Sequence, residues 1–281
     1  MDTLPLTILT ALSLISILIL ISVGMAIIFG MMNVINLAHG EFVMLGAYVA
    51  VIAAQIGGFW LALAIAPLLG AGFGILLEST IIRLLYRRPI DTIIATLGVS
   101  LVVQKLVELW FGSSPYSVMN PLPGLVDVFG TPYPLYRIFV IGCAAAVLLL
   151  GMIAYRSTNF GLNLRAAIQD PEMARAMGVD VAATYRIAFG LGAGLAALAG
   201  VLVAPLTSIF PGMGLAYLIR SFFVVIVGGT GSIGGVLAGS AFIGFFESFF
   251  SFRLGGAFPQ AIVLALAIIV VRLRPKGLVS G

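Results

Sequence analysis

The only histidine of the chain lies beside a carboxylate, in a polar cluster inside an otherwise apolar segment, NVINLAHGEFVMLGAY. The members of this cluster are Asn33, Asn36, His39 and Glu41. One imidazole and one nearby carboxylate are too few ligands for a metal site unless distant residues contribute. Polar groups are costly in an apolar environment, so they usually face a path or a partner. Two interpretations remain open: a structural hydrogen-bond network, or residues that line or gate a path.

A glycine-rich stretch, GTGSIG from Gly229 to Gly234, matches the pattern of dinucleotide-binding loops letter for letter. Such a loop needs a strand–turn–helix unit and an acidic residue about 20 residues further on, but that position is Leu254. Gly231, Gly235 and Gly239 instead repeat at the four-residue spacing that lets membrane helices approach closely. We therefore predict a backbone break with close packing. The candidate path residues from this stretch are Gly229, Gly231 and Ser232.

Enzyme chemistry is not predicted, because neither lysine, Lys105 or Lys276, follows the glycines of a phosphate-binding loop. A single histidine also leaves little for general base catalysis. We expect no catalytic residue, no metal and no cofactor. Four other ionisable residues fall in or near apolar spans: Glu78, Lys105, Glu108 and Glu247. Lys105 and Glu108 are three residues apart and share a helix face, which predicts a local ion pair, with a proton relay as the alternative.

The amino-acid composition indicates that these residues belong to a membrane protein. Of 281 residues, 62% are hydrophobic and 9% are charged, whereas a soluble domain carries roughly 25% charged residues. Continuous apolar runs reach the roughly 20 residues that cross a bilayer, and they lack the alternation of a membrane barrel. We predict an all-α, polytopic transmembrane bundle of about eight segments in one domain, 1–281. Membrane lipid is the expected partner. Nucleic acid is not, because the basic residues behind the net charge of +4 lie at helix ends.

The predicted segments are of two kinds. The continuous spans are at about 6–30, 59–82, 92–111, 135–155, 186–208 and 257–273. Two further segments, 33–57 and 218–252, are interrupted by the polar and glycine-rich stretches. Arginines after the second span, in the loop at about 156–186 and at the end of the chain predict cytoplasmic positions. The loop 112–134 has no lysine or arginine and is expected outside.

This orientation constrains the second interrupted segment. Both of its flanking spans have a cytoplasmic end, so 218–252 must enter the membrane and return, as a re-entrant hairpin or as two short passages. Irregular backbone is tolerated at membrane depth only where protein or a water-filled cavity surrounds it. The segment therefore indicates an internal path.

One polar stretch in the cytoplasmic loop, QDPEMARAMGVD, predicts a short helix from Pro171 to Met177. Asp170 is a suitable N-cap, and proline is favoured in the first helical position. Glu172 favours the positive end of the helix, and Gly178 suits the left-handed position that follows it. Alone in water this helix is marginal. Its apolar face of Met173, Ala174 and Met177 therefore requires a partner, either a second protein or the membrane domain itself.

A resemblance to a known family rests on four pieces that occur in this order: GMMNVINLAHGEFVMLGAY, RRPIDTIIATLGVSLVVQ, NFGLNLRAAIQDPEMARAMGVD and VVIVGGTGSIGGVLAGSAFIG. Together they resemble the permease subunits of branched-chain amino acid ABC importers and of the related urea and short-chain amide importers. The similarity covers nearly the whole chain. It implies a multi-pass permease of the prokaryotic cell (inner) membrane. The implied partners are a second homologous permease, two ATP-binding cassette subunits that hydrolyse ATP, and a periplasmic or lipid-anchored binding protein.

The resemblance also gives the short helix a role, because in this family the matching loop docks on the ATPase. The implied coupling residues are Asp170, Pro171, Glu172, Met173, Arg175, Met177 and Gly178. The loop RAAIQDPEMARAMG lacks the full Glu-Ala-Ala…Gly signature of many ABC importers, so these residues follow from position and chemistry. The stretch RPIDTIIATLGVSLVVQ favours the urea-type branch, although amino acids remain the preferred substrate. An ion-coupled secondary transporter or channel is the alternative of another class, because such folds also contain interrupted segments.

Overall fold

The structure, a computed structural model, describes residues 3–32, 36–86, 88–128, 130–229, 232–254, 258–274 and 277–279. Its elements are α1 (Thr3–Met32), α2 (His39–Ile56), α3 (Phe59–Thr80), η1 (Ile82–Leu85), α4 (Pro89–Phe111), β1 (Leu125–Val128), β2 (Thr131–Pro134), α5 (Leu135–Ser157), α6 (Asn159–Gln169), α7 (Pro171–Ala176), α8 (Val181–Val203), η2 (Ala204–Leu206), α9 (Met213–Gly228), α10 (Ile233–Ser251) and α11 (Phe258–Leu273). Within the described residues, seven helices are long and apolar enough to cross a membrane, and α9 and α11 are shorter apolar helices. The predicted all-α membrane bundle is confirmed.

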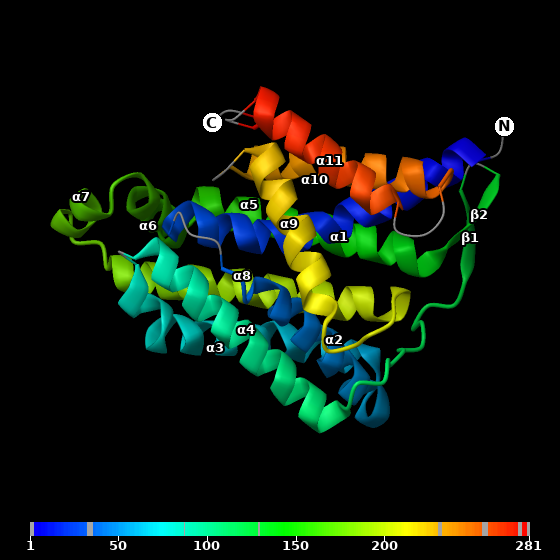
Figure 1. Ribbon diagram of the computed structural model, residues 1–281, viewed down its shortest axis with the longest axis horizontal. Helices are drawn as coiled ribbons and strands as arrows, with labels where there is room; N and C mark the ends of the chain where they lie inside the picture. Colours follow the sequence, from blue (N-terminus) through cyan, green and yellow to red (C-terminus); the bar gives the residue numbers. More distant parts are fainter. Residues whose placement is uncertain are drawn as a thin grey trace.

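Most of the long helices run side by side along the molecule (Figure 1). α1, α2 and α3 all pack along α8, and 78% of the α8 span is buried, against 11% of the α5 span. α8 is therefore the inner element, and α3, α4 and α5 turn most of their surface outward. An α-helix can occupy either the interior of the bundle or its lipid-facing surface, because its backbone N–H and C=O groups hydrogen-bond to one another.

Small residues bring α8 into backbone contact with its neighbours. A Cβ added at Gly46 of α2 would lie 2.0 Å from the carbonyl oxygen of Ala197, and one added at Gly200 would lie 2.0 Å from that of Val43. On the α3 side, a Cβ at Gly74 would lie 2.6 Å from the Cβ of Ala193. Such contacts are the usual basis of helix association in lipid, where apolar side chains gain little by leaving the bilayer.

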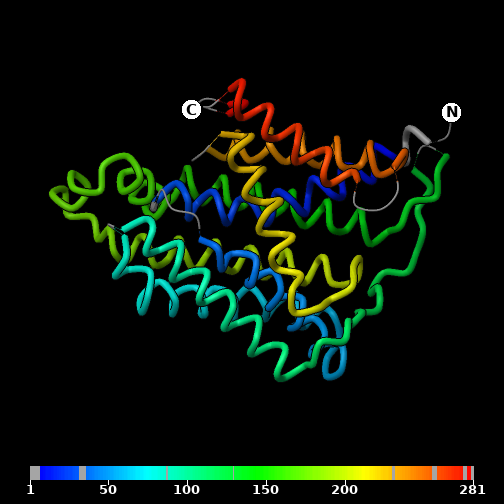
Figure 2. The backbone as a smooth tube through the Cα atoms, viewed as in Figure 1, coloured from blue at the N-terminus to red at the C-terminus, as the bar shows by residue number. Residues whose placement is uncertain are grey.

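The interrupted segment 218–252 forms two helices, α9 and α10, that are separated by a break. Gly229 follows α9 with a φ of +107°, and the Ser232 hydroxyl caps α10 by accepting a hydrogen bond from the Gly235 amide at 2.9 Å. Figure 2 shows α9 crossing the long helices at a steep angle. The C-terminal tail covers the end of α9, because the amides of Leu278 and Val279 donate to carbonyls of its last turn at 2.8 and 3.1 Å.

The other interrupted segment, 33–57, becomes the single helix α2, preceded by non-helical backbone at residues 36–38. The break thus precedes the helix. The loop 112–134 contains a two-stranded antiparallel hairpin, β1–β2, in which Leu125 pairs with Pro134 and Val128 with Thr131. This hairpin is an addition to the all-α prediction. It lies at the opposite end of the molecule from α7, as the orientation from the basic residues requires (Figure 1).

This arrangement predicts the sidedness of exposed positions. Cysteines introduced at Ser157 and Ala176, in a Cys143→Ser background, should react only with reagent on the cytoplasmic side. A cysteine at Ser114 should react from outside, because its loop lies at the other end. The measurement is labelling of intact cells with a membrane-impermeant maleimide, and labelling of position 176 in intact cells would overturn the orientation.

The α9–α10 contact predicts an asymmetry between neighbouring glycines. A Cβ at Gly239 would lie 2.1 Å from the Val224 carbonyl oxygen, whereas one at Gly234 would meet only a Val279 methyl group at 3.8 Å. Gly239→Ala should lower the thermal stability of the purified permease, by the roughly 1–3 kcal/mol typical of overpacking. Gly234→Ala on the same helix is the matched control and should be tolerated. Equal melting temperatures for the two variants would contradict this account of the packing.

Candidate functional site

The short helix of the cytoplasmic loop has the caps that the sequence predicts. The Asp170 carboxylate accepts hydrogen bonds from the amides of Glu172 and Met173 at 3.0 and 2.9 Å, and Pro171 begins α7. The helix ends at Ala176, one residue earlier than predicted, with Met177 as its C-cap. Gly178 follows with a φ of +86°, the left-handed conformation expected of it.

The apolar face of α7 is divided between two environments. Ala174 is buried in a small apolar cluster with Ala167 of α6 and Tyr185 of α8, so this residue has the internal partner that the sequence left open. Met173 and Met177 remain 61% and 79% exposed. The other exposed members of the predicted coupling set are Asp170, Glu172, Arg175 and Gly178, and Pro171 is partly buried. α7 is thus anchored by one residue while two methionines face outward.

The polar cluster that precedes and begins α2 is buried and only partly hydrogen-bonded. His39 Nε2 donates to the Ile21 carbonyl at 3.0 Å, and Asn36 Oδ1 accepts from the Ala38 amide at 3.0 Å. Glu41 accepts from the Ser100 hydroxyl at 2.8 Å. Three atoms of the cluster have no hydrogen-bond partner in the described structure: Asn36 Nδ2, His39 Nδ1 and Glu41 Oε2. No group of three potential metal ligands is found among the described residues, and Asn33 lies outside them.

A polar stripe on α4 reaches this cluster through two of its three hydroxyl side chains, whereas the third, that of Thr92, donates to the Leu85 and Arg88 carbonyls. Thr92, Thr96 and Ser100 are spaced four residues apart and so share one helix face. Thr96 accepts from the Leu37 amide at 3.2 Å, one turn before the Ser100–Glu41 hydrogen bond. Sequence reasoning missed these partners, although the four-residue spacing of hydroxyl side chains in an apolar helix is a signal that could have identified them.

The two parts of the predicted path are not brought together. The start of α2 meets the start of α9, where a Cβ at Gly40 would lie 2.1 Å from the Gly214 carbonyl oxygen. Gly229 and Ser232 lie at the other end of α9. The helical rise separates the two ends by about 20 Å. Gly231 lies outside the described residues. The candidate path therefore divides into a polar site at the start of α2 and a glycine break at the end of α9.

Two of the remaining ionisable residues form the predicted surface pair, because Lys105 Nζ lies 2.6 Å from Glu108 Oε2 with both side chains exposed. Glu247 of α10 is instead buried against Arg220 of α9, at 2.9 Å. The Arg220 guanidinium also lies 5.8 Å from the ring centroid of Tyr217. The Arg220–Glu247 ion pair was not predicted, because it joins two helices, α9 and α10, on either side of the break.

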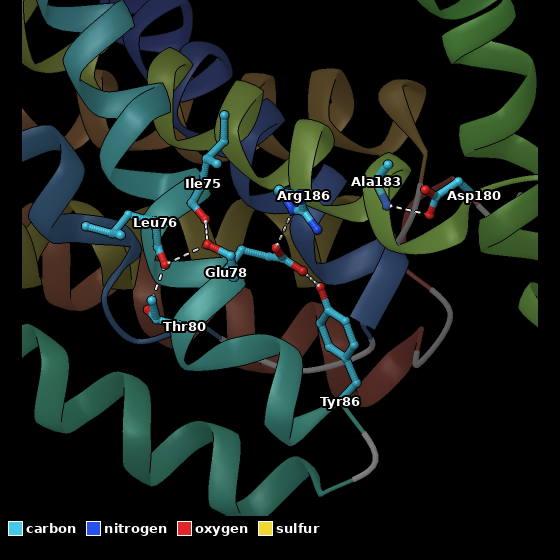
Figure 3. A network of polar contacts seen from close by, with 9 residues as sticks. Ile75, Leu76, Glu78, Thr80, Tyr86, Asp180, Ala183 and Arg186 are labelled. Atoms are coloured by element: carbon cyan, nitrogen blue, oxygen red, sulfur yellow. Dashed lines mark hydrogen bonds and ion pairs between the residues drawn. The ribbon is translucent and has the colours of Figure 1, made fainter.

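Glu78 is fully buried at the end of α3, between residues from two other segments (Figure 3). One carboxylate oxygen accepts a hydrogen bond from the Tyr86 hydroxyl, and the other lies 3.6 Å from Arg186 Nε of α8. Burial, together with this hydrogen bond to Glu78, raises the pKa of Tyr86. The tyrosine therefore stays protonated as the donor. Glu78 was noted in the sequence, but neither of its partners was.

An apolar cavity of about 380 Å³ lies between α2, α3, α4 and α8. Its walls include Leu45 of α2, Phe73 of α3 and Val103 of α4. Ligand sites usually combine an apolar wall with a few placed polar groups, and this lining offers none. The cavity instead separates much of α4 from α3.

The bundle of long apolar helices, with its two interrupted segments, defines the class of polytopic membrane proteins. The family described as "Branched-chain amino acid transport system / permease component" matches residues 7–272, so the chain belongs to this family. With its seven helices of membrane-crossing length among the described residues, it is a multi-pass protein of the prokaryotic cell membrane.

Several curated proteins are similar over nearly the full length. The high-affinity branched-chain amino acid transport system permease protein BraD of Pseudomonas aeruginosa is 28% identical, covering 92% of this chain and 89% of BraD. The corresponding LivH of Escherichia coli K12 is also 28% identical, over 92% of this chain and 89% of LivH. A probable LivH of Methanocaldococcus jannaschii is 28% identical, over 91% and 86%. No solved structure gives a significant match.

The buried cluster at α2 predicts a functional effect of two substitutions. Glu41→Gln removes the charge at nearly constant shape, and Asn36→Leu removes hydrogen bonding. If the cluster lines or gates the path, each should lower uptake by about tenfold or more, because a hydrogen bond to a charged group contributes about 1.5–3 kcal/mol. Lys105→Gln is the matched control, since its exposed ion pair contributes about 0–1 kcal/mol. If both cluster variants transport substrate at the parental rate at every pH tested, the cluster has only a structural role and the gating hypothesis is wrong.

Proposed function

We propose that this chain is the membrane-spanning subunit of an ATP-driven ABC importer and forms the translocation path for branched-chain or related amino acids. A periplasmic or lipid-anchored binding protein delivers the substrate. A second homologous permease completes the path, and separate ATP-binding cassette subunits hydrolyse ATP. Family membership and the similarity to the branched-chain amino acid transport permeases BraD and LivH support the substrate class. The single transmembrane domain, 1–281, carries its coupling loop at about 156–186.

The observation that carries this proposal is the exposure of α7. Helix caps hold its conformation, and burial of Ala174 holds its position. Two methionines nevertheless face outward at the end of the molecule opposite the β1–β2 hairpin (Figure 1). Apolar burial contributes about 25 cal/mol per Å². Docking both methionines in a groove of an ATPase subunit therefore stabilises the contact by about 2–4 kcal/mol.

The residues of the path remain part of the proposal. Asn36, His39 and Glu41 are the side chains proposed to line or gate it, because they are buried at an interrupted segment and keep unpartnered polar atoms. Gly229 and Ser232 are proposed to form a second break that adjusts as access alternates. Asn33 and Gly231, which lie outside the described residues, are included in the first and the second group because of their positions in the sequence.

Two alternatives have specific support. The RPIDTIIATLGVSLVVQ stretch favours urea or a short-chain amide as substrate, and ligand-binding measurements on the cognate binding protein decide between these and amino acids. The unpartnered Glu41 oxygen favours an ion-coupled secondary transporter or channel. Uptake that depends on pH and needs no ATP would establish that alternative.

Met173→Asp tests the docking of α7 directly. The charge should weaken co-purification with the ATPase and abolish uptake, while the permease stays folded, because position 173 is exposed. Met119→Asp, at a residue 90% exposed in the loop 112–134, is the matched control. Gly178→Val should act more mildly, through the roughly 1–3 kcal/mol of strain at its left-handed backbone. The measurement is substrate-stimulated ATP hydrolysis and uptake in reconstituted complexes, and parental values for Met173→Asp would exclude α7 as the coupling element.

A further inference from the structure

The Glu78 site joins three segments that are distant in sequence but meet beside the cytoplasmic loop. Glu78 lies in the last turn of α3, Tyr86 follows η1, and Arg186 lies in the second turn of α8. Glu78 Oε2 and Arg186 Nε face each other at 3.6 Å, and each lacks a hydrogen-bond partner in the described structure (Figure 3). Charged hydrogen bonds of this kind are typically about 2.7–2.9 Å long. A relative displacement of less than about 1 Å therefore makes or breaks this bond.

On one side, the site is connected to the loop that carries α7. Tyr185, the neighbour of Arg186, donates its hydroxyl to the Ala167 carbonyl of α6 at 3.0 Å. Its ring meets the Tyr86 ring edge-on, with centroids 5.6 Å apart. Ala174 of α7 belongs to the same apolar cluster. A displacement of α7 is therefore carried into the first turns of α8.

On the other side, the site is connected to α4. Thr92 in the first turn of α4 donates to the Leu85 carbonyl at 2.9 Å, directly before Tyr86. Most of α4 faces outward, and the apolar cavity lies between its second half, around Val103 and Val107, and α3. α4 also carries Thr96 and Ser100, which hydrogen-bond to Leu37 and Glu41 at the polar start of α2. Thus α4 has both room to shift and direct contact with the candidate gate.

We propose that Glu78, Tyr86 and Arg186 are positioning residues that transmit displacement of the α6–α7 loop to α4, and through α4 to the polar cluster at α2. Small sliding of packed helices is a recognised way for a local contact to switch a larger structure. This inference rests on the proposed ATP-driven function, because that function supplies the force on α7. It adds the residues that convert the force into movement within the membrane.

A static structural role makes a different prediction. A buried ion pair is weak evidence for stability, and losing a merely structural contact alters folding and complex yield. Loss of a transmitting contact changes the ratio of substrate transported to ATP hydrolysed. The coupling ratio of the assembled complex therefore separates the two roles.

Tyr86→Phe is the most selective variant, because it removes the hydroxyl but keeps the ring beside Tyr185. In the reconstituted full complex it should leave ATP hydrolysis near the parental rate. It should lower uptake per ATP by about fivefold or more, the lower end of coupling between distant sites. Arg186→Gln should do the same, and Arg186→Lys, which retains the charge, should restore part of the ratio. Tyr116→Phe in the 112–134 loop and Arg253→Gln, at an exposed position just after α10, are matched controls and should keep the parental ratio.

A distance measurement provides a second test, which can be used where a variant complex assembles too poorly for its coupling ratio to be measured. Spin labels at Leu101 of α4 and Leu191 of α8, both exposed, report the movement of α4 in a Cys143→Ser background. The parent should show an ATP-dependent distance change that Tyr86→Phe lacks. An unchanged movement, or a parental uptake-to-ATP ratio in both Tyr86→Phe and Arg186→Gln, overturns this inference. A parent complex whose uptake needs no ATP overturns the proposed function instead.

Discussion

Backbone contact between α8 and its neighbours is the constraint on which the rest of the bundle depends. In lipid, apolar side chains gain little by leaving the bilayer for another helix, so close packing must hold the helices together. Gly46 and Gly200 allow α2 and α8 to touch through their backbones, and Gly194 does the same for α3, where a Cβ would lie 2.8 Å from the Pro67 carbonyl oxygen. These contacts fix the start of α8 relative to the end of α3. The Glu78–Arg186 pair lies at that position, so its 3.6 Å separation is set by the packing of whole helices.

The interruptions of the bundle are tolerated because other segments satisfy their backbone groups. Before α2, the Leu37 amide donates to Thr96 of α4, and the Ala38 amide donates to Asn36. At the end of α9, amides of the C-terminal tail supply the missing donors. Irregular backbone inside a membrane requires such partners. The two breaks are therefore tied to α4 and to the tail, and movement of either element changes the hydrogen bonding of a break.

Features set by local physical chemistry could be predicted from the sequence. The capped helix after Asp170 depends on a few neighbouring residues, and the spans depend on continuous apolar length. The partners of Glu78 and Glu247 could not be predicted, because each ion pair joins helices whose arrangement follows from packing along their whole length. The same reason explains why one predicted path became two sites at opposite ends of α9. The roles of these residues in docking and transport remain predictions.

The contrast between α8 and α4 connects the structure to a mechanism. α8 is mostly buried, contacts α1, α2 and α3, and begins directly after the loop that carries α7. Most of its length is held by these neighbours, whereas its first turns, around Tyr185, also contact the α6–α7 loop. α4 is mostly exposed, borders the cavity, and contacts the start of α2 and the turn before it through the hydroxyl groups of Ser100 and Thr96. In the proposed coupling, a force applied at α7 meets a closely packed inner unit and a less tightly held outer helix. The proposed movement is then concentrated between these two parts, where Glu78 and Tyr86 connect them.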